Sequence, residues 1–268
     1  MPALVLIRGA GDLASGVAVR LHRAGLRVVM TELARPRAVR RTVAFAEAIY
    51  EGSVNVEGIL GRRASHPEEA LRILKLVETR EVPVLADPDC LSASLFRPLV
   101  IVDARMSKVP PEPLTYSAEL LIGLGPGFSA PQDCDAVVET ERGHTLGRVI
   151  FDGSAHPDSK LPEGDARRIL RAPVDGLFRS AAHIGQHFEQ GQMIATIDDR
   201  PILAPFVGVL RGLLRAETPV HAGMKVGDID ARDDASLCRL VSDKSLAVGG
   251  GVLEAILTRP EVRSKLWV

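Results

Sequence analysis

Cysteine is scarce in this chain, and neither sign of charge is in excess. The 268 residues include three cysteines, Cys90, Cys134 and Cys238, and no CxxC pair. An odd number of widely spaced cysteines predicts a reduced, cytoplasmic protein and argues against a zinc site, so no metal ligands are predicted. The formal net charge of -1 gives no sign of a basic surface that would bind nucleic acid, and the chain has no acidic tail.

Long hydrophobic runs are also missing. No apolar stretch approaches the length of a membrane span. Arg8 and Asp12 interrupt the short apolar run near the N-terminus, which argues against a signal peptide. We therefore expect no membrane partner. The length is ample for a sizeable core, and two domains are the natural expectation.

A glycine loop near the N-terminus organises the first half of the chain. It follows the apolar run Leu4–Ile7 and precedes a helix pattern that ends near Gly25. A second apolar run then ends at Glu32, 21 residues after Gly11. This order of strand, glycine turn, helix, strand and acid is typical of a dinucleotide-binding unit.

Each residue of this unit has a physical role in holding a cofactor. Glycine at the first position permits a tight turn, glycine at the second lets the backbone approach a phosphate, and a small residue allows close helix packing. The acid at the end of the second strand would bind a ribose. Asp12 argues against NAD(P), because its carboxylate would cap the helix start and repel a phosphate. The loop could also be a capped scaffold that binds nothing. The candidate cofactor-binding residues are Gly9, Gly11, Asp12, Leu13, Ala14 and Glu32.

Two later features continue the predicted sheet. Val82–Ala86 and Leu99–Val102 read as buried strands, so strands alternating with helices predict a mainly parallel sheet. Asp103 follows the second of these strands, at the edge where such sheets bind ligands. Asp103 and the nearby Lys108 are candidate catalytic residues; alternatively, Asp103 caps the next turn.

A second glycine loop follows the apolar run Leu120–Leu124. Gly123, Gly125 and Gly127 would leave backbone N–H groups bare for an anion, so they join the candidate cofactor-binding residues. We expect this loop and the Gly11 loop to face one cleft. His144, at a later turn, is a candidate proton-handling residue, or an idle exposed histidine. Residues 152–165 read as a linker between domains.

The second half contains an internal repeat. Residues 172–230 repeat with a period of 32, and both halves are rich in short β-prone runs and glycine turns. The pattern resembles the barrel-sandwich hybrid of biotinyl and lipoyl carriers. The hairpin that joins the halves, residues 197–202, has no lysine, and Lys225 lies away from it. We therefore expect a docking module without biotin or lipoate.

The expected fold class is α/β. A Rossmann-like domain at 1–165 would precede a barrel-sandwich domain at 166–232 and a C-terminal helical tail at 233–268 that packs on the first domain. The tail carries Gly249-Gly250-Gly251, which suggests close backbone packing or an anion-binding turn. Cys238 is either a thiol nucleophile or a buried structural residue.

Several stretches, taken together and in order, resemble the YqeB-type selenium-dependent molybdenum hydroxylase system proteins. The likeness runs over nearly the whole chain. Its motifs are Gly9–Ala14, Arg40–Ala48, Gly123–Phe128, Glu139-Thr140 with Arg142-Gly143-His144, and Ser242-Asp243-Lys244 with Gly249–Ala255.

That resemblance implies a cytoplasmic accessory protein for maturing molybdenum hydroxylases, distantly similar to the XdhC/CoxF maturation factors. Its cofactor would be an anionic pterin or nucleotide, such as molybdopterin or its dinucleotide form, in preference to NAD(P). Its partner would be a hydroxylase client or another maturation factor, and a homo-oligomer is compatible with this role. The alternatives are an NAD(P)-dependent oxidoreductase and a non-catalytic interaction scaffold. Fold analogy does not decide between them.

Overall fold

The computed structural model describes residues 3–76, 80–112, 114–157 and 164–267. The chain divides into two compact units. Unit 1 comprises Met1–Pro36, Ala44–Ser159 and Val241–Val268, and unit 2 comprises Arg37–Val43 and Lys160–Leu240. The domain boundaries near residues 165 and 232 stay predictions, because a domain is defined by its ability to fold alone. Residues 158–163 of the predicted linker lie outside the described residues.

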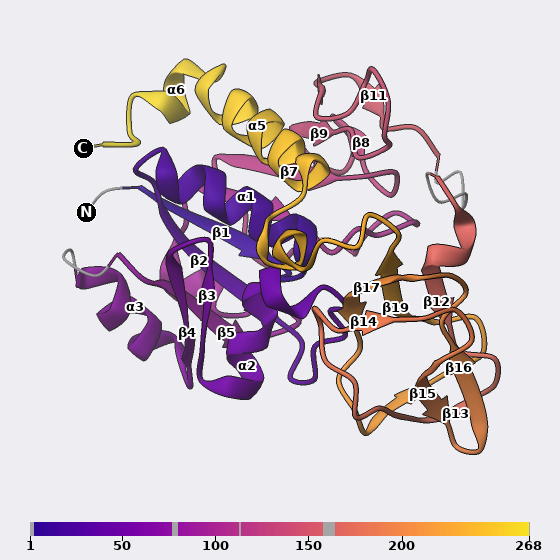
Figure 1. The fold of residues 1–268 in the computed structure, drawn as a ribbon. Coiled ribbons are helices and arrows are strands. Elements are labelled where there is room, and N and C mark those ends of the chain that lie inside the picture. Colours follow the sequence, from indigo (N-terminus) through magenta and orange to yellow (C-terminus); the bar gives the residue numbers. More distant parts are fainter. Residues whose placement is uncertain (1–2, 77–79, 113, 158–163, 268) are drawn as a thin grey trace. The chain divides into compact units, whose positions relative to one another are not determined.

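Unit 1 is built on a nine-stranded sheet (Figure 1). Its strands lie in the order β10-β9-β7-β6-β1-β2-β5-β4-β3. The central neighbours from β9 to β4 are parallel, whereas β3 pairs antiparallel with β4 and β10 pairs antiparallel with β9. The strands are β1 (Leu4–Arg8), β2 (Arg27–Glu32), β3 (Ser53–Val56), β4 (Ile59–Ala64), β5 (Val82–Ala86), β6 (Val100–Asp103), β7 (Leu120–Leu124), β9 (Ala136–Val138) and β10 (Val149–Ile150). A separate two-stranded sheet pairs β8 (Ser129–Ala130) with β11 (Gly153–Ser154).

The central strands form because their apolar runs are buried on both faces. Val5, Leu6 and Ile7 of β1 are fully buried, as expected of a parallel strand covered on both sides.

The helices of unit 1 are α1 (Asp12–Arg23), α2 (Ala48–Glu51), α3 (Pro67–Lys75), α4 (Ala93–Phe96), α5 (Asp243–Leu257) and α6 (Pro260–Arg263), with the 3₁₀ turn η2 (Phe45–Glu47). None of the helices in the described ranges has the length and hydropathy needed to cross a membrane.

Helices α1 and α5 lie side by side and run in parallel (Figure 1). A Cβ atom on Gly16 of α1 would come within 2.5 Å of the Cβ atom of Ser245 on α5. One turn further along each helix, a Cβ atom on Gly249 would come within 2.8 Å of Cγ of Arg20. Glycine is therefore required for the two backbones to approach this closely.

The first part of the predicted fold class is wrong. A Rossmann-like domain alternates strands with crossover helices, but no helix occurs among the described residues between β6 and β7 or between β7 and β9. The sheet is also mixed, with an antiparallel strand at each edge. Short apolar runs signal buried strands, but they specify neither strand direction nor the connection between strands.

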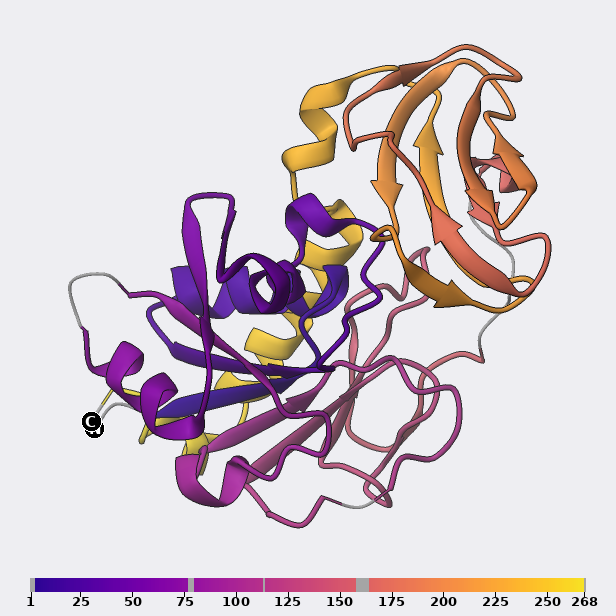
Figure 2. The same cartoon turned by 90° about the horizontal axis from the view of Figure 1, so that it is seen from below.

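Unit 2 contains two separate four-stranded antiparallel sheets, in the orders β12-β19-β17-β14 and β16-β15-β13-β18. The core cluster contains side chains from both, among them Phe178 and Ile197 from one sheet and Leu210 and Ile229 from the other. The two sheets therefore face each other, and Figure 2 shows their strands in orange. The strands are β12 (Ile169–Arg171), β13 (Gly176–Arg179), β14 (His187–Phe188), β15 (Met193–Ile197), β16 (Arg200–Leu203), β17 (Gly208–Leu213), β18 (Thr218–Val220) and β19 (Lys225–Asp230). The 3₁₀ turns η1 (Arg41–Val43), η3 (Ala166–Arg168) and η4 (Ala235–Arg239) complete the unit.

The second part of the predicted fold class is corrected in the same way. In place of a barrel-sandwich hybrid of the biotinyl or lipoyl type, the structure has two distinct sheets, and each takes one strand from the other half of the repeat. Strand β14 joins the sheet of the second half, and β18 joins the sheet of the first. The repeat pattern locates short strands, whereas contacts between distant residues decide how those strands pair.

Candidate functional site at the carboxyl edge of the sheet

The carboxyl ends of the parallel strands bring most of the candidate residues of unit 1 to one edge. Strand β1 leads into the Gly9 loop, β2 ends at Glu32 and β6 ends at Asp103. Strand β7 leads into Gly125, and β9 leads into Glu139. Because β6 lies between β1 and β7, the two glycine loops follow strands about 10 Å apart.

The first glycine loop has a conformation that depends on Gly9. This residue has φ +103°, a region that favours glycine, and its N–H donates to the carbonyl of Thr31 over 2.7 Å. Gly11 is the N-cap of α1, and a Cβ atom there would meet no heavy atom within 4 Å. Leu13 is half-buried, and Ala14 is buried against the fold. The start of α1 therefore has open space in front of Gly11.

Glu32 reaches back to this loop. Its Oε2 accepts the N–H of Ala10 over 2.8 Å, and its Oε1 accepts the N–H of Leu33 over 2.7 Å. Each carboxylate oxygen has a second lone pair, so further donors can still bind. Glu32 thus fixes the glycine loop in addition to the ribose contact predicted for it.

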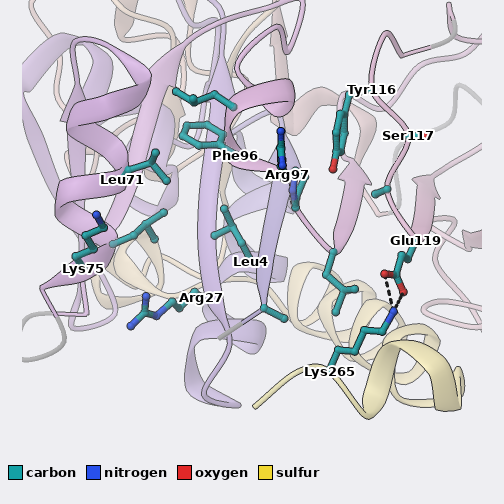
Figure 3. A pocket seen from close by; sticks show the side chains of 16 residues that line it. Leu4, Arg27, Leu71, Lys75, Phe96, Arg97, Tyr116, Ser117, Glu119 and Lys265 are labelled. Atoms are coloured by element: carbon teal, nitrogen blue, oxygen red, sulfur yellow. Dashed lines mark hydrogen bonds and ion pairs between the residues drawn. The ribbon is translucent and has the colours of Figure 1, made fainter. Parts of the chain in front are cut away.

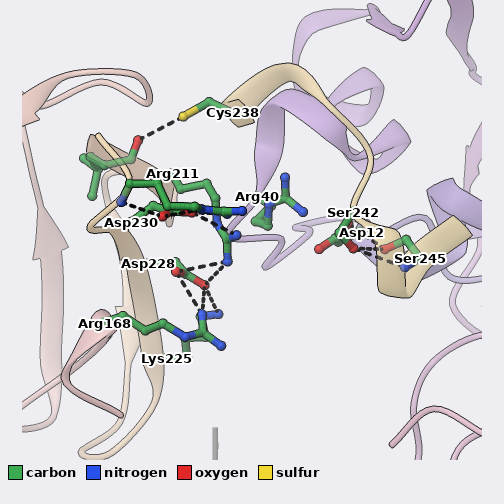
Figure 4. Close-up of polar contacts among 12 residues, drawn as sticks. Asp12, Arg40, Arg168, Arg211, Lys225, Asp228, Asp230, Cys238, Ser242 and Ser245 are labelled. Carbon is green, nitrogen blue, oxygen red and sulfur yellow. Dashed lines mark hydrogen bonds and ion pairs between the residues drawn. The ribbon is translucent and has the colours of Figure 1, made fainter. Parts of the chain in front are cut away.

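The start of α5 lies beside the start of α1 (Figure 4). The hydroxyl of Ser245 donates to Oδ1 of Asp12 over 3.0 Å. Ser242 is the N-cap of α5, and its Oγ accepts the N–H of Ser245 over 3.1 Å. Two helix N-termini, each with partial positive charge, therefore meet at this edge.

The second glycine loop contains one glycine of special conformation and two that are needed for packing. Gly125 has φ +86°, and a Cβ atom there would lie 3.1 Å from Oγ1 of Thr140. A Cβ atom on Gly123 would collide with the ring of Phe128, and one on Gly127 would lie 2.5 Å from the carbonyl oxygen of Ser107. Small size at Gly123 and Gly127 is explained by these contacts with the protein itself.

Asp103 is held in an ion-pair network. Its side chain is almost fully buried, and Arg105 binds both carboxylate oxygens, with N–O distances of 3.0 and 2.7 Å. Arg8 adds an ion pair at 3.7 Å and also donates to the carbonyl of Pro88. Lys108 is exposed on the segment that follows. This network favours a structural role for Asp103.

The sequence interpretation missed a pair formed by Glu139 and His156. Glu139 is 1% exposed, and its Oε2 lies 2.6 Å from Nδ1 of His156. Burial by itself would raise the pKa of Glu139, but hydrogen bonds from the N–H groups of Glu141, His156 and Thr140 and from the His156 ring lower it overall. His144, the predicted proton-handling residue, is exposed in a turn. A buried carboxylate that orients a half-exposed imidazole is the better arrangement for proton transfer.

Glu139 could have been found from the sequence, because it directly follows the buried strand β9, much as Asp103 stands at the carboxyl end of β6. His156 carries no such signal, since it lies in the stretch interpreted as a linker.

The cysteines do not add a nucleophile. Burial and the nearby charge of Asp87 raise the pKa of Cys90 to about 11, and burial also raises the pKa of Cys238. Both thiols are buried, and Sγ of Cys238 lies 3.8 Å from the carbonyl oxygen of Leu210. A structural role for Cys238 agrees with this environment. No group of three or more His, Cys, Asp or Glu side chains suited to a metal ion occurs within the described residues.

A comparison with known proteins connects this chain to one relative in particular. No family model matches it. A protein of Escherichia coli K12 named "Uncharacterized protein YqeB" is 45% identical over 258 residues, which is 95% of this chain. Over these residues the chain belongs to the YqeB-type family. The chain spans about half of that relative, 47% of its length.

Solved structures give a much weaker likeness for this YqeB-type chain. An aspartoacylase family protein from Mesorhizobium loti is 13% identical with a TM-score of 0.27, and the match covers 85% of this chain and 84% of the other. A succinylglutamate desuccinylase/aspartoacylase from Rhodobacter sphaeroides is 11% identical with a TM-score of 0.28, and has the same coverage. TM-scores this low carry no conclusion about fold or function.

Proposed function

We propose that this YqeB-type chain is a cytoplasmic accessory protein in the maturation of molybdenum hydroxylases. Its role would be to hold an anionic pterin or nucleotide, such as molybdopterin or its dinucleotide form, and to pass it to a hydroxylase client or to another maturation factor. The pathway in this proposal rests on the resemblance of the ordered sequence motifs to the YqeB-type selenium-dependent molybdenum hydroxylase system proteins, and the carboxyl edge of the unit 1 sheet supports the binding of an anion.

The observation that carries the binding proposal is the open start of α1. Gly11 provides no side chain to cap the helix, and the space that a Cβ atom would enter is empty of protein atoms. Backbone N–H groups at a helix start bind anions through hydrogen bonds and the helix dipole. The adjacent start of α5 adds a second dipole of the same sense.

Asp12 is the reason to favour a pterin or another nucleotide over NAD(P). Its carboxylate lies at the first position of α1, where NAD(P) would place its pyrophosphate. A ligand with hydrogen-bond donors, such as the amino group of a pterin, would meet acceptors in both Asp12 and Glu32. The oxidoreductase alternative relies on the same loop, so a binding measurement separates the two.

The test combines ligand identification with a blocking variant. Protein purified without oxygen is denatured and the released small molecules are identified by mass spectrometry, and calorimetry compares NAD, NADP and molybdopterin dinucleotide. We expect the pterin nucleotide to bind at least tenfold more tightly than NAD(P), and Gly11→Val to abolish that binding. Gly250→Val is the matched control, since Gly250 also faces open space but lies within α5.

Binding of NAD(P) alone would favour the oxidoreductase. If none of the three compounds binds, the loop held by Glu32 is a scaffold and the proposal fails.

A further inference from the structure

A cavity lies at the amino edge of the unit 1 sheet, opposite the edge that carries the glycine loops. The cavity has a volume of about 670 Å³ and is lined by residues just before or at the starts of β1, β2, β6 and β7, together with α3 and α4. This volume lies within the range of pockets that hold small organic molecules. The candidate residues named from the sequence do not line it.

The walls of the cavity are largely apolar. Leu4, Leu71, Leu74 and Tyr116 are half-buried and pack on a core cluster of buried side chains, to which Phe96 belongs. Figure 3 shows Leu4, Leu71 and Phe96 gathered around the same space. Half-buried apolar side chains around one space provide a surface that an apolar ligand body can cover.

The charged residues at the cavity are mostly basic. Its lining includes four basic side chains and a single acidic one, Glu119. Glu119 is already bound by Lys265, whose Nζ lies 2.6 and 2.7 Å from the two carboxylate oxygens. The other three basic residues of the lining are Arg27, Lys75 and Arg97, and no described side chain forms an ion pair with them. In Figure 3, Arg27 and Lys75 lie on one side and the Lys265–Glu119 pair on the other.

Arg97 has a backbone conformation that is unfavourable for its side chain. It ends α4 with φ +47°, in the left-handed region where glycine is preferred. Arg97 also lines the cavity, so its side chain is placed where a ligand could meet it. Lys75, by contrast, is also explained in part by the negative end of the α3 dipole.

We infer that this cavity binds a small organic acid with an apolar body, such as an acyl carboxylate. The apolar walls cover the body, and the three basic residues that form no ion pair with a described side chain bind the carboxylate. The site is separate from the glycine loops, because it lies at the other end of the same strands.

The test uses octanoate and the uncharged 1-octanol of equal chain length, measured by calorimetry on the full chain. We expect octanoate to bind about tenfold more tightly than 1-octanol, because hydrogen bonds to charged groups are strong. Ala118→Trp, which fills the cavity from its wall, should abolish binding. Arg97→Gly should weaken octanoate binding about fivefold. Its thermal unfolding midpoint should stay the same or rise, since glycine suits the left-handed backbone.

Arg72→Gln is the matched control, because Arg72 is an exposed basic residue of α3 that does not line the cavity. It should leave octanoate binding unchanged. Equal affinity for octanoate and 1-octanol would overturn the inference, as would an absence of octanoate binding at millimolar concentration. A sedimentation result in which Ala118→Trp dissociates a dimer would show that a second copy covers this face instead.

Discussion

The carboxylate of Glu32, at the end of β2, accepts the backbone N–H of Ala10 in the glycine loop over 2.8 Å. This bond joins the loop after β1 to the end of β2, and it gives Glu32 a structural role beside its proposed contact with a ligand. The same residue is therefore a point where stability and binding can be measured together.

Replacing Glu32 with alanine should destabilise unit 1 by about 1–3 kcal/mol, because it leaves the N–H group of the buried Ala10 without its acceptor. Urea denaturation followed by circular dichroism measures this loss. Glu57→Ala is an unsuitable control, since Glu57 accepts the N–H of Val241 in the same unit. Glu68→Ala, at an exposed position on α3, should cost far less. If Glu32→Ala unfolds at the same urea concentration as the wild type, the role given to this bond is wrong.

Replacing Asp12 with alanine should strengthen NADP binding at the start of α1 by about 0.3–1 kcal/mol, since a negative charge is removed next to the bound pyrophosphate. Calorimetry with NADP and with a molybdopterin nucleotide measures the change. Ser245→Ala serves as the control, because it removes the hydroxyl that donates to Asp12 and keeps the carboxylate. Asp12→Ala should weaken binding of the pterin nucleotide, because the proposed acceptor for its amino group is lost, and unchanged or stronger pterin binding would contradict that contact.

Alanine substitutions at two neighbouring glycines of α5 should have opposite effects on the stability of the protein. A Cβ atom on Gly251 would collide with the carbonyl oxygen of Gly147, so Gly251→Ala should destabilise the protein by about 1–3 kcal/mol. Gly250 has no heavy atom in the way of a Cβ, so Gly250→Ala should stabilise it by up to about 1 kcal/mol. Thermal and urea unfolding of the pair provide the measurement. Equal effects in both variants would argue against the close approach of α5 to the Gly147 turn.

Unit 2 should lose stability in acid through Asp230. Hydrogen bonds from the Arg232 side chain lower the pKa of Asp230 to about 2, with a further contribution from Arg211. Since this folded-state pKa is below the usual value of 3.8, Asp230 contributes stability above about pH 4. That contribution, about 2 kcal/mol, is lost progressively as the pH falls through 2.

Asp230→Asn provides the check on this pH dependence. The difference in unfolding free energy between wild type and variant, measured from pH 5 to pH 2, should shrink as the pH falls. A difference that stays constant over this range would contradict the prediction. Asp228 contributes in the same direction: burial opposes its charge, but Lys225, Arg211 and Arg168 lower its pKa overall (Figure 4).

The amino-acid sequence by itself determined the local elements around the glycine loop. Strand β1, the start of α1 at Asp12 and the end of β2 at Glu32 lie where the pattern predicts them, and the positive φ of Gly9 fits the tight turn expected there. Such features depend on residues close together in sequence, through hydrophobic periodicity and the conformational freedom of glycine. The YqeB-type family was also readable from ordered motifs, and the sequence comparison confirms it.

Only the tertiary structure decided which strands pair and which side chains meet. The antiparallel edges of the sheet, the bond between Ser245 and Asp12, and the Glu139–His156 pair join residues far apart in sequence. Residues that line the amino-edge cavity are similarly dispersed, from Ala3 to Lys265. Their positions depend on sheet order and helix packing, which a local pattern does not encode. The packing role of Gly123 also depends on the tertiary structure, because the ring of Phe128 lies against it.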